Sequence, residues 1–122
     1  MGAMGKKPLV LIVEDEPRII KLLKVSFELD GFAVTSAKDG REALASIEAE
    51  PPDIMILDIL LPVMDGFEVL RRLALSRRFP VIAVSSNLEL KQEATKLGAE
   101  RFISKPFDPN KIVDTARALL KR

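Results

Sequence analysis

The stretch LVLIVEDEP, residues 9–17, decides the fold because it joins an apolar run, an acidic loop and the start of a helix. Residues 9–13 form an unbroken apolar run, which is typical of a strand covered on both faces. Pro17 suits the first turn of a helix, where a backbone N–H has no intrahelical partner in any case. The stretch therefore predicts a strand and a helix with carboxylates in the loop between them.

The same order of strand and helix recurs four more times along the chain. Each time, a β-rich or apolar run is followed by turn residues and then by apolar residues at helical spacing. The expected strands cover residues 9–13, 32–36, 54–57, 80–84 and 101–104. The expected helices run from Pro17 to the break at Asp30-Gly31, from Asp39-Gly40 to the break at Pro51-Pro52, and over residues 66–75, 88–97 and 108–120.

This alternation predicts an α/β fold. Right-handed crossovers between successive strands give a parallel sheet with helices on both faces. For a chain of this length we expect the flavodoxin-like (βα)5 doubly wound sheet, with strand order 2-1-3-4-5. Its switch point lies between the first and third strands, and ligands bind there beyond the carboxyl ends of the strands. The loops of interest are therefore residues 14–16 and 58–65.

Composition limits the chemistry that the chain can perform. The 122 residues carry 19 basic and 18 acidic side chains, and 48% are hydrophobic, as in a single soluble globular domain. There is no His and no Cys, which excludes disulfides, thiol nucleophiles, His-based triads and most transition-metal sites. The sequence shows neither a membrane-spanning run nor a secretory signal, so we expect a cytoplasmic protein.

Two further features concern the ends and the charge distribution of the chain. Residues 1–5 read MGAMG, which is typical of a vector or cleavage scar, and the domain is expected to cover residues 6–122. The tightest basic group is Arg71, Arg72, Arg77 and Arg78, which lacks interleaved aromatic residues. We interpret it as a solvated helix face rather than a nucleic-acid site, and we expect no direct contact with nucleic acid or membrane.

Acidic residues follow the first and third predicted strands. Glu14 and Asp15 come after the first strand, and Asp58 ends the apolar run of the third. The fold brings these carboxylates together at the switch point, where their mutual repulsion must be offset by a cation or by protons. Oxygen ligands of this kind suit Mg²⁺. The sequence therefore predicts a magnesium site at this edge.

A hydroxyl and an ammonium group are predicted at the same edge. Ser85 ends the fourth strand and Lys105 follows the fifth. With Asp58 and Mg²⁺ they make up the parts needed to receive a phosphoryl group, a reaction that depends mainly on positioning and on neutralising oxygen charge.

Four ordered segments also carry a family resemblance. They are residues 10–16 (VLIVEDE), 37–44 (AKDGREAL), 58–66 (DILLPVMDG) and 105–107 (KPF). With these segments the chain resembles, from about Pro8 to Leu120, a response-regulator receiver domain of two-component signal transduction, of the chemotaxis-regulator kind. An Asp followed by Leu-Pro and then Asp-Gly at fixed offsets is the most specific of the matches.

The resemblance implies a role for each acidic residue. Asp58 would be the phosphoacceptor. Asp15 and Asp58 would ligate Mg²⁺, with the backbone carbonyl of Leu60 as a third protein ligand. Glu14 would complete the acidic pocket and act on the metal indirectly.

The resemblance also implies roles at the fourth and fifth strands. Ser85 would hydrogen-bond a phosphoryl oxygen and Lys105 would pair with another. Ser85 and Phe102 would form the switch, with Phe102 at the position of an aromatic switch residue. The Lys105-Pro106 peptide bond would be cis.

These roles imply partners. The chain has no His, so a phosphohistidine donor must lie on a histidine kinase or phosphotransfer protein. The switched surface would control a downstream effector protein or a C-terminal output domain absent from this chain. Such a signalling domain catalyses only its own phosphorylation and dephosphorylation and is not otherwise an enzyme.

Other functions remain as alternatives. A constitutive docking receiver would share the fold without turning over phosphate. A haloacid-dehalogenase-type aspartyl-phosphate phosphatase needs a second Asp two residues after the first, where this chain has Leu60. A flavodoxin-type cofactor binder needs a Ser/Thr/Gly-rich phosphate loop where this chain has three acids.

Overall fold

The computed structural model describes residues 7–121 and confirms the flavodoxin-like sheet. All neighbouring strands pair in parallel, in the order β2-β1-β3-β4-β5. The strands are β1 (Leu9–Val13), β2 (Ala33–Ala37), β3 (Ile54–Asp58), β4 (Val81–Ser85) and β5 (Arg101–Ser104). The expected scar at residues 1–5 lies outside the described residues.

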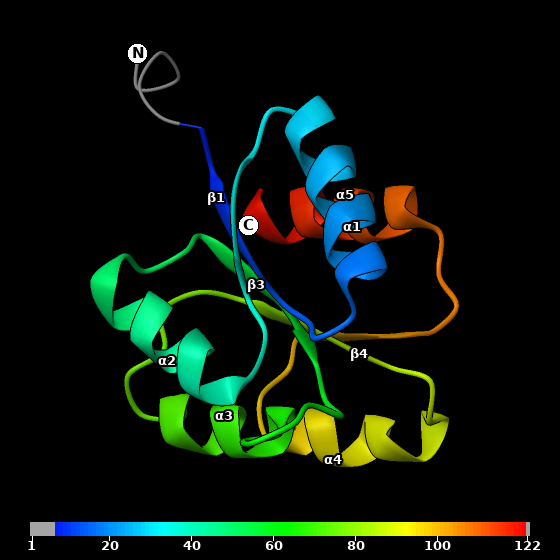
Figure 1. The fold of residues 1–122 in the computed structure, drawn as a ribbon. Coiled ribbons are helices and arrows are strands. Elements are labelled where there is room, and N and C mark those ends of the chain that lie inside the picture. Colours follow the sequence, from blue (N-terminus) through cyan, green and yellow to red (C-terminus); the bar gives the residue numbers. More distant parts are fainter. Residues whose placement is uncertain (1–6, 122) are drawn as a thin grey trace.

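Helices cover both faces of this sheet. They are α1 (Pro17–Leu29), α2 (Gly40–Ala49), α3 (Gly66–Leu73), α4 (Lys91–Lys96) and α5 (Pro109–Leu120), with a 3₁₀ turn, η2 (Leu88–Leu90), before α4. Helices α1 and α5 lie on one side, and α2, α3 and α4 lie on the other (Figure 1). None of the helices in residues 7–121 has the length and apolar character that a membrane span requires.

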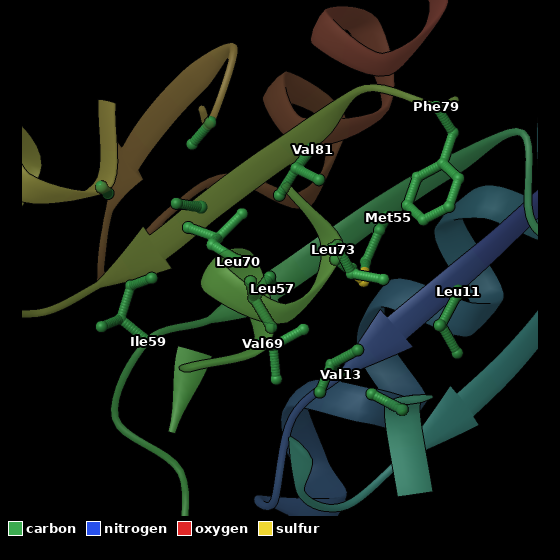
Figure 2. Close-up of a cluster of buried hydrophobic side chains, with 14 of the residues drawn as sticks. Leu11, Val13, Met55, Leu57, Ile59, Val69, Leu70, Leu73, Phe79 and Val81 are labelled. Carbon is green, nitrogen blue, oxygen red and sulfur yellow. The ribbon is translucent and has the colours of Figure 1, made fainter. Parts of the chain in front are cut away.

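The core is divided into two layers by the sheet. Alternate residues of each strand point to opposite faces, so Val10 and Ile12 pack with α1 and α5, whereas Leu11 and Val13 pack toward α2 and α3. Figure 2 shows the second layer, in which Leu57 lies among side chains of α3. Both layers are apolar up to the carboxyl edge of the sheet, where polar side chains begin.

Several strands begin or end at residues other than those predicted. Phe32 belongs to the turn after α1 because its N–H bonds to the Phe27 carbonyl oxygen at 3.0 Å, so β2 begins one residue later than expected. Strand β3 extends one residue further than expected and β4 begins and ends one residue later, which places Asp58 and Ser85 inside the sheet. Asp58 and Ser85 are therefore held by strand pairing rather than by loops.

Helices α3 and α4 are both shorter than predicted. Helix α3 ends at Leu73, two residues before the expected end, and its inner face buries Val69, Leu70 and Leu73. The expected helix over residues 88–97 divides into η2 and a six-residue α4, whose only buried residue is Ala94. This segment is thus attached to the core by Ala94 and by the partly buried Leu90 and Leu97.

The basic group on and after α3 is not uniformly solvated. Arg71 and Arg72 pair with Glu68 at the surface, in agreement with the expectation. Arg77 differs, since its guanidinium bonds to Glu100 Oε1 at 3.0 Å and to the carbonyl oxygen of Gly98 at 2.6 Å. This arginine therefore ties the loop before β4 to the loop before β5.

Candidate functional site

The candidate site lies at the carboxyl edge of the three central strands and β5. Glu14 directly follows β1, Asp58 and Ser85 end β3 and β4, and Lys105 directly follows β5. Glu14, Asp58 and Ser85 are the buried polar residues among the described residues. The parallel topology thus brings together residues that are far apart in the sequence.

Lys105 joins two of the carboxylates. Its Nζ lies 2.8 Å from Asp58 Oδ2 and 3.0 Å from Glu14 Oε1, and it donates a hydrogen bond to each. The Lys105 side chain is 20% exposed, so these bonds are only partly screened by water. One ammonium group therefore faces two carboxylates, which leaves the centre of the site acidic.

The pKa of Glu14 is raised by its surroundings. Burial raises its pKa from 4.5 to about 7, and the charge of Asp58 adds to this effect, while hydrogen bonds from Lys105 and the Glu16 N–H act in the opposite direction. For Lys105, burial lowers the pKa, but the hydrogen bonds to Asp58 and Glu14 outweigh it, so its pKa lies above 10.5. The Glu14 carboxyl therefore gains a proton much more readily near neutral pH than an ordinary glutamate does.

Asp15 completes a set of oxygen donors. One carboxylate oxygen from each of Glu14, Asp15 and Asp58 lies within 4.8 Å of the others. Asp15 is exposed, so it faces the side from which a hydrated ion would enter. Carboxylate oxygens are the donors that Mg²⁺ prefers, and this donor set fits that ion.

Asp58 is also held by the chain that follows it. Its Oδ1 accepts a hydrogen bond from the Leu60 N–H at 3.1 Å, and its Oδ2 accepts from Lys105. Leu60 lines the same hollow as Asp15 and Asp58, with its side chain 56% exposed. These two hydrogen bonds therefore fix the orientation of the Asp58 carboxylate.

Ser85 is buried at the end of β4, the strand that pairs with β3, and its hydroxyl is engaged by the following loop. Its Oγ accepts from the Asn87 N–H at 3.1 Å, and its backbone carbonyl accepts from the Lys105 N–H at 2.9 Å. The hollow over the carboxylates is lined by the neighbouring Ser86, which our sequence analysis did not single out as a site residue. Ser85 is the buried last residue of β4, whereas Ser86 is exposed in the loop that follows, and the sequence carries no signal for this difference.

Phe102 lies outside this hollow. It is half-buried on β5, packs against the core layer of α2, α3 and α4, and lines a separate groove with Leu88 and Lys91. The Lys105–Pro106 peptide bond is cis, as the resemblance implies. Phe102 lies on β5, and Lys105 directly follows the end of that strand.

Comparison with protein families and solved structures agrees with this geometry. The model of the response regulator receiver domain matches residues 10–117. The receiver domain of Francisella response regulator 1452 is 33% identical, with a TM-score of 0.89, covering 95% of this chain and 98% of that one. The chemotaxis response regulator CheY4 of Vibrio cholerae is 30% identical, with a TM-score of 0.87, covering 93% and 99%.

Curated relatives are longer proteins. The alkaline phosphatase synthesis transcriptional regulatory protein PhoP of Bacillus subtilis is 38% identical over 98% of this chain and 50% of its own length. The transcriptional regulatory protein TrcR of Mycobacterium tuberculosis is 37% identical over 98% and 48%. The chain spans about half the length of the curated relatives that it matches.

Proposed function

The chain belongs to the response regulator receiver family, and on that premise we propose that it is a phosphorylation-controlled switch with Asp58 as its phosphoacceptor. The environment of Asp58 is the main support for its role as the phosphoacceptor. It is buried at the end of β3, hydrogen-bonded through both oxygens, and beside two further carboxylates. Receiver domains are signalling modules, and the chemistry proposed here is confined to the domain's own phosphorylation and dephosphorylation.

The proposed reaction is the transfer of a phosphoryl group to a carboxylate. A partner histidine kinase or phosphotransfer protein presents phosphohistidine, and an oxygen of Asp58 attacks the phosphorus in line. The O–P bond of an acyl phosphate forms, the P–N bond breaks, and the leaving imidazole takes up a proton. The donor must be a partner because this chain contains no His.

Residues of this chain supply the charge balance. Asp15, Asp58 and the Leu60 carbonyl oxygen would hold Mg²⁺, with Glu14 acting indirectly. Bound there, Mg²⁺ would neutralise charge on the phosphoryl oxygens. The ammonium of Lys105, now 2.8 Å from Asp58, would pair with one phosphoryl oxygen.

Switching is proposed to start at Ser85. Its hydroxyl would leave the Asn87 N–H and hydrogen-bond the new phosphoryl oxygen, and Phe102 would move into the space that is freed. This movement would bias the surface of α4, β5 and α5 toward an active form. The burial pattern of α4 supports this, since Ala94 is its only fully buried residue.

The relatives indicate what the switched surface could control. The relatives are named as transcriptional regulators and are about twice as long as this chain. We propose that the switched surface acts in the cytoplasm on an effector protein or a C-terminal output domain, with no direct contact of residues 7–121 with nucleic acid or membrane.

Labelling of the Asp58→Asn variant tests the assignment. The wild-type protein should take a phosphoryl group from a phosphorylated kinase or from acetyl phosphate in the presence of Mg²⁺, and the variant should take none. Equal labelling of both proteins would reject Asp58. Mg²⁺-dependent binding of beryllofluoride to the wild type separates this function from a constitutive docking module, which would bind none.

A further inference from the structure

The start of α2 approaches the loop that follows the phosphoacceptor unusually closely. This loop, residues 59–65, is here named the phosphoacceptor loop. The Gly40 N–H donates a hydrogen bond to the Met64 carbonyl oxygen at 3.1 Å. A Cβ on Gly40 would lie 2.5 Å from that oxygen and 2.8 Å from both Cβ and Cγ of Met64. Any side chain at position 40 would therefore push the loop away or break the hydrogen bond.

Close approach is the reason for a glycine at this position. Among the described glycines, only Gly31 and Gly98 have a positive φ, so the backbone of Gly40 is open to any residue. The contact with Met64 is therefore the feature that favours glycine at this first position of α2.

The loop side of the contact is bent into an uncommon conformation. Val63 has a φ of 65°, in the left-handed region that a β-branched residue rarely adopts. Its side chain is 74% exposed, and the Met64 N–H bonds to the Pro62 carbonyl oxygen at 2.6 Å across this bend. Such strain persists where the surroundings fix the backbone, and here Gly40 provides the fixing contact.

The beginning of the phosphoacceptor loop contacts Asp58. The Leu60 N–H bonds to Asp58 Oδ1, and the Gly66 N–H closes the loop on the Ile59 carbonyl oxygen at 2.8 Å. The segment before α2 reaches the other half of the site, since the Glu14 N–H bonds to the Ala37 carbonyl oxygen at 3.0 Å. Residues 37–40 thus connect the end of β1 to the phosphoacceptor loop.

We propose that Gly40 is a positioning residue for Mg²⁺ binding and phosphoryl acceptance. It acts through Met64, by holding the phosphoacceptor loop so that the Leu60 backbone lies against Asp58. The inference rests on the proposed function, because the loop matters only if Asp58 and Leu60 serve the metal and the phosphoryl group.

Gly40→Ala tests this role. Indirect supports of metal ligands typically contribute about 10- to 100-fold to metal affinity, and we expect the variant to bind Mg²⁺ at least about tenfold more weakly in isothermal titration. Beryllofluoride binding should weaken in parallel. In the metal-free protein, amide hydrogen exchange at Leu60 should become faster, because its bond to Asp58 is loosened.

Ala45→Gly is the matched control. Ala45 is exposed on α2, so the change lowers helix stability without touching the loop, and its Mg²⁺ affinity should equal that of the wild type. Gly40→Ala should be measured with trimethylamine N-oxide if needed to keep it folded. Unchanged Mg²⁺ affinity, a failure to fold under these conditions, or an equal loss in Ala45→Gly would each overturn the inference. Absence of Mg²⁺ binding in the wild type would instead overturn the proposed function.

Discussion

The ammonium nitrogen of Lys105 lies 2.8 Å from Asp58 Oδ2, although 47 residues separate the two in the sequence. The same nitrogen lies 3.0 Å from Glu14 Oε1. In the metal-free protein Lys105 therefore neutralises part of the charge that a divalent cation would otherwise balance. Under the proposed function, the stability of the domain and its affinity for Mg²⁺ would be linked through this one side chain.

Lys105→Met should destabilise the metal-free domain and increase the stabilisation that Mg²⁺ provides. Loss of the ammonium leaves two buried carboxylates without their partner, which we expect to cost about 1–2 kcal/mol at this partly exposed position. Denaturant unfolding with EDTA and with Mg²⁺ measures both quantities. Lys111→Met, on the exposed side of α5, is the control and should change neither. A variant as stable as the wild type in EDTA would contradict the prediction.

Glu14 should make the metal-free domain less stable as the pH rises from 4.5 to about 7. The folded state raises the pKa of Glu14 from 4.5 to about 7, so it holds the proton more tightly than the unfolded chain. Its contribution to stability is complete below pH 4.5 and is lost as the pH rises through about 7, with an upper size of about 3 kcal/mol.

The difference in unfolding free energy between the wild type and Glu14→Gln isolates this effect from the other carboxylates. In EDTA, the wild type should lose stability relative to the variant across that pH range. A difference that stays constant from pH 4.5 to 7 would show that Glu14 does not titrate as described.

The meeting of Glu14 and Asp58 was predictable because a parallel sheet brings the carboxyl ends of its strands to one edge. Apolar runs located the strands, and the acids that ended or followed them marked the site. Apolar residues on both faces of the three central strands, β1, β3 and β4, also indicated helices on both sides of the sheet. Local pattern and global topology agree at these positions, which is why the sequence was sufficient there.

Side-chain direction and long-range pairing could not be predicted in the same way. Nothing in the sequence shows that the Ser85 hydroxyl accepts from the Asn87 N–H, because this depends on the path of the loop after β4. Arg77 lies in a basic cluster, yet its partner Glu100 comes from a different loop. The division of the helix expected at 88–97 likewise reflects how few of its residues reach the core.

Arg77→Ala should lower the unfolding free energy by about 2 kcal/mol. The guanidinium bonds to Glu100 and to the carbonyl oxygens of Phe79 and Gly98, and its side chain is only 15% exposed. Its removal leaves a half-buried carboxylate and two carbonyl oxygens without their donor. Arg71→Ala removes an exposed pair with Glu68 and should cost less than about 0.5 kcal/mol in the same denaturation experiment. An equal loss of unfolding free energy in the two variants would contradict the prediction that Arg77 contributes more to stability than Arg71.

Asp15→Asn should remove most of the stabilisation by Mg²⁺ while leaving the metal-free domain unchanged to within about 0.5 kcal/mol. Asp15 is exposed, and the only role proposed for its carboxylate is to hold the ion with Asp58. An ion that binds only the folded state raises the unfolding free energy by about 2.7 kcal/mol at 100 times its dissociation constant, so the wild type should show a clear gain on titration with Mg²⁺. Asp114→Asn, an exposed acid on α5, should keep that gain in full. If Asp15→Asn gains as much as the wild type, the ion binds elsewhere, and Asp15 is only a charged residue of the loop after β1.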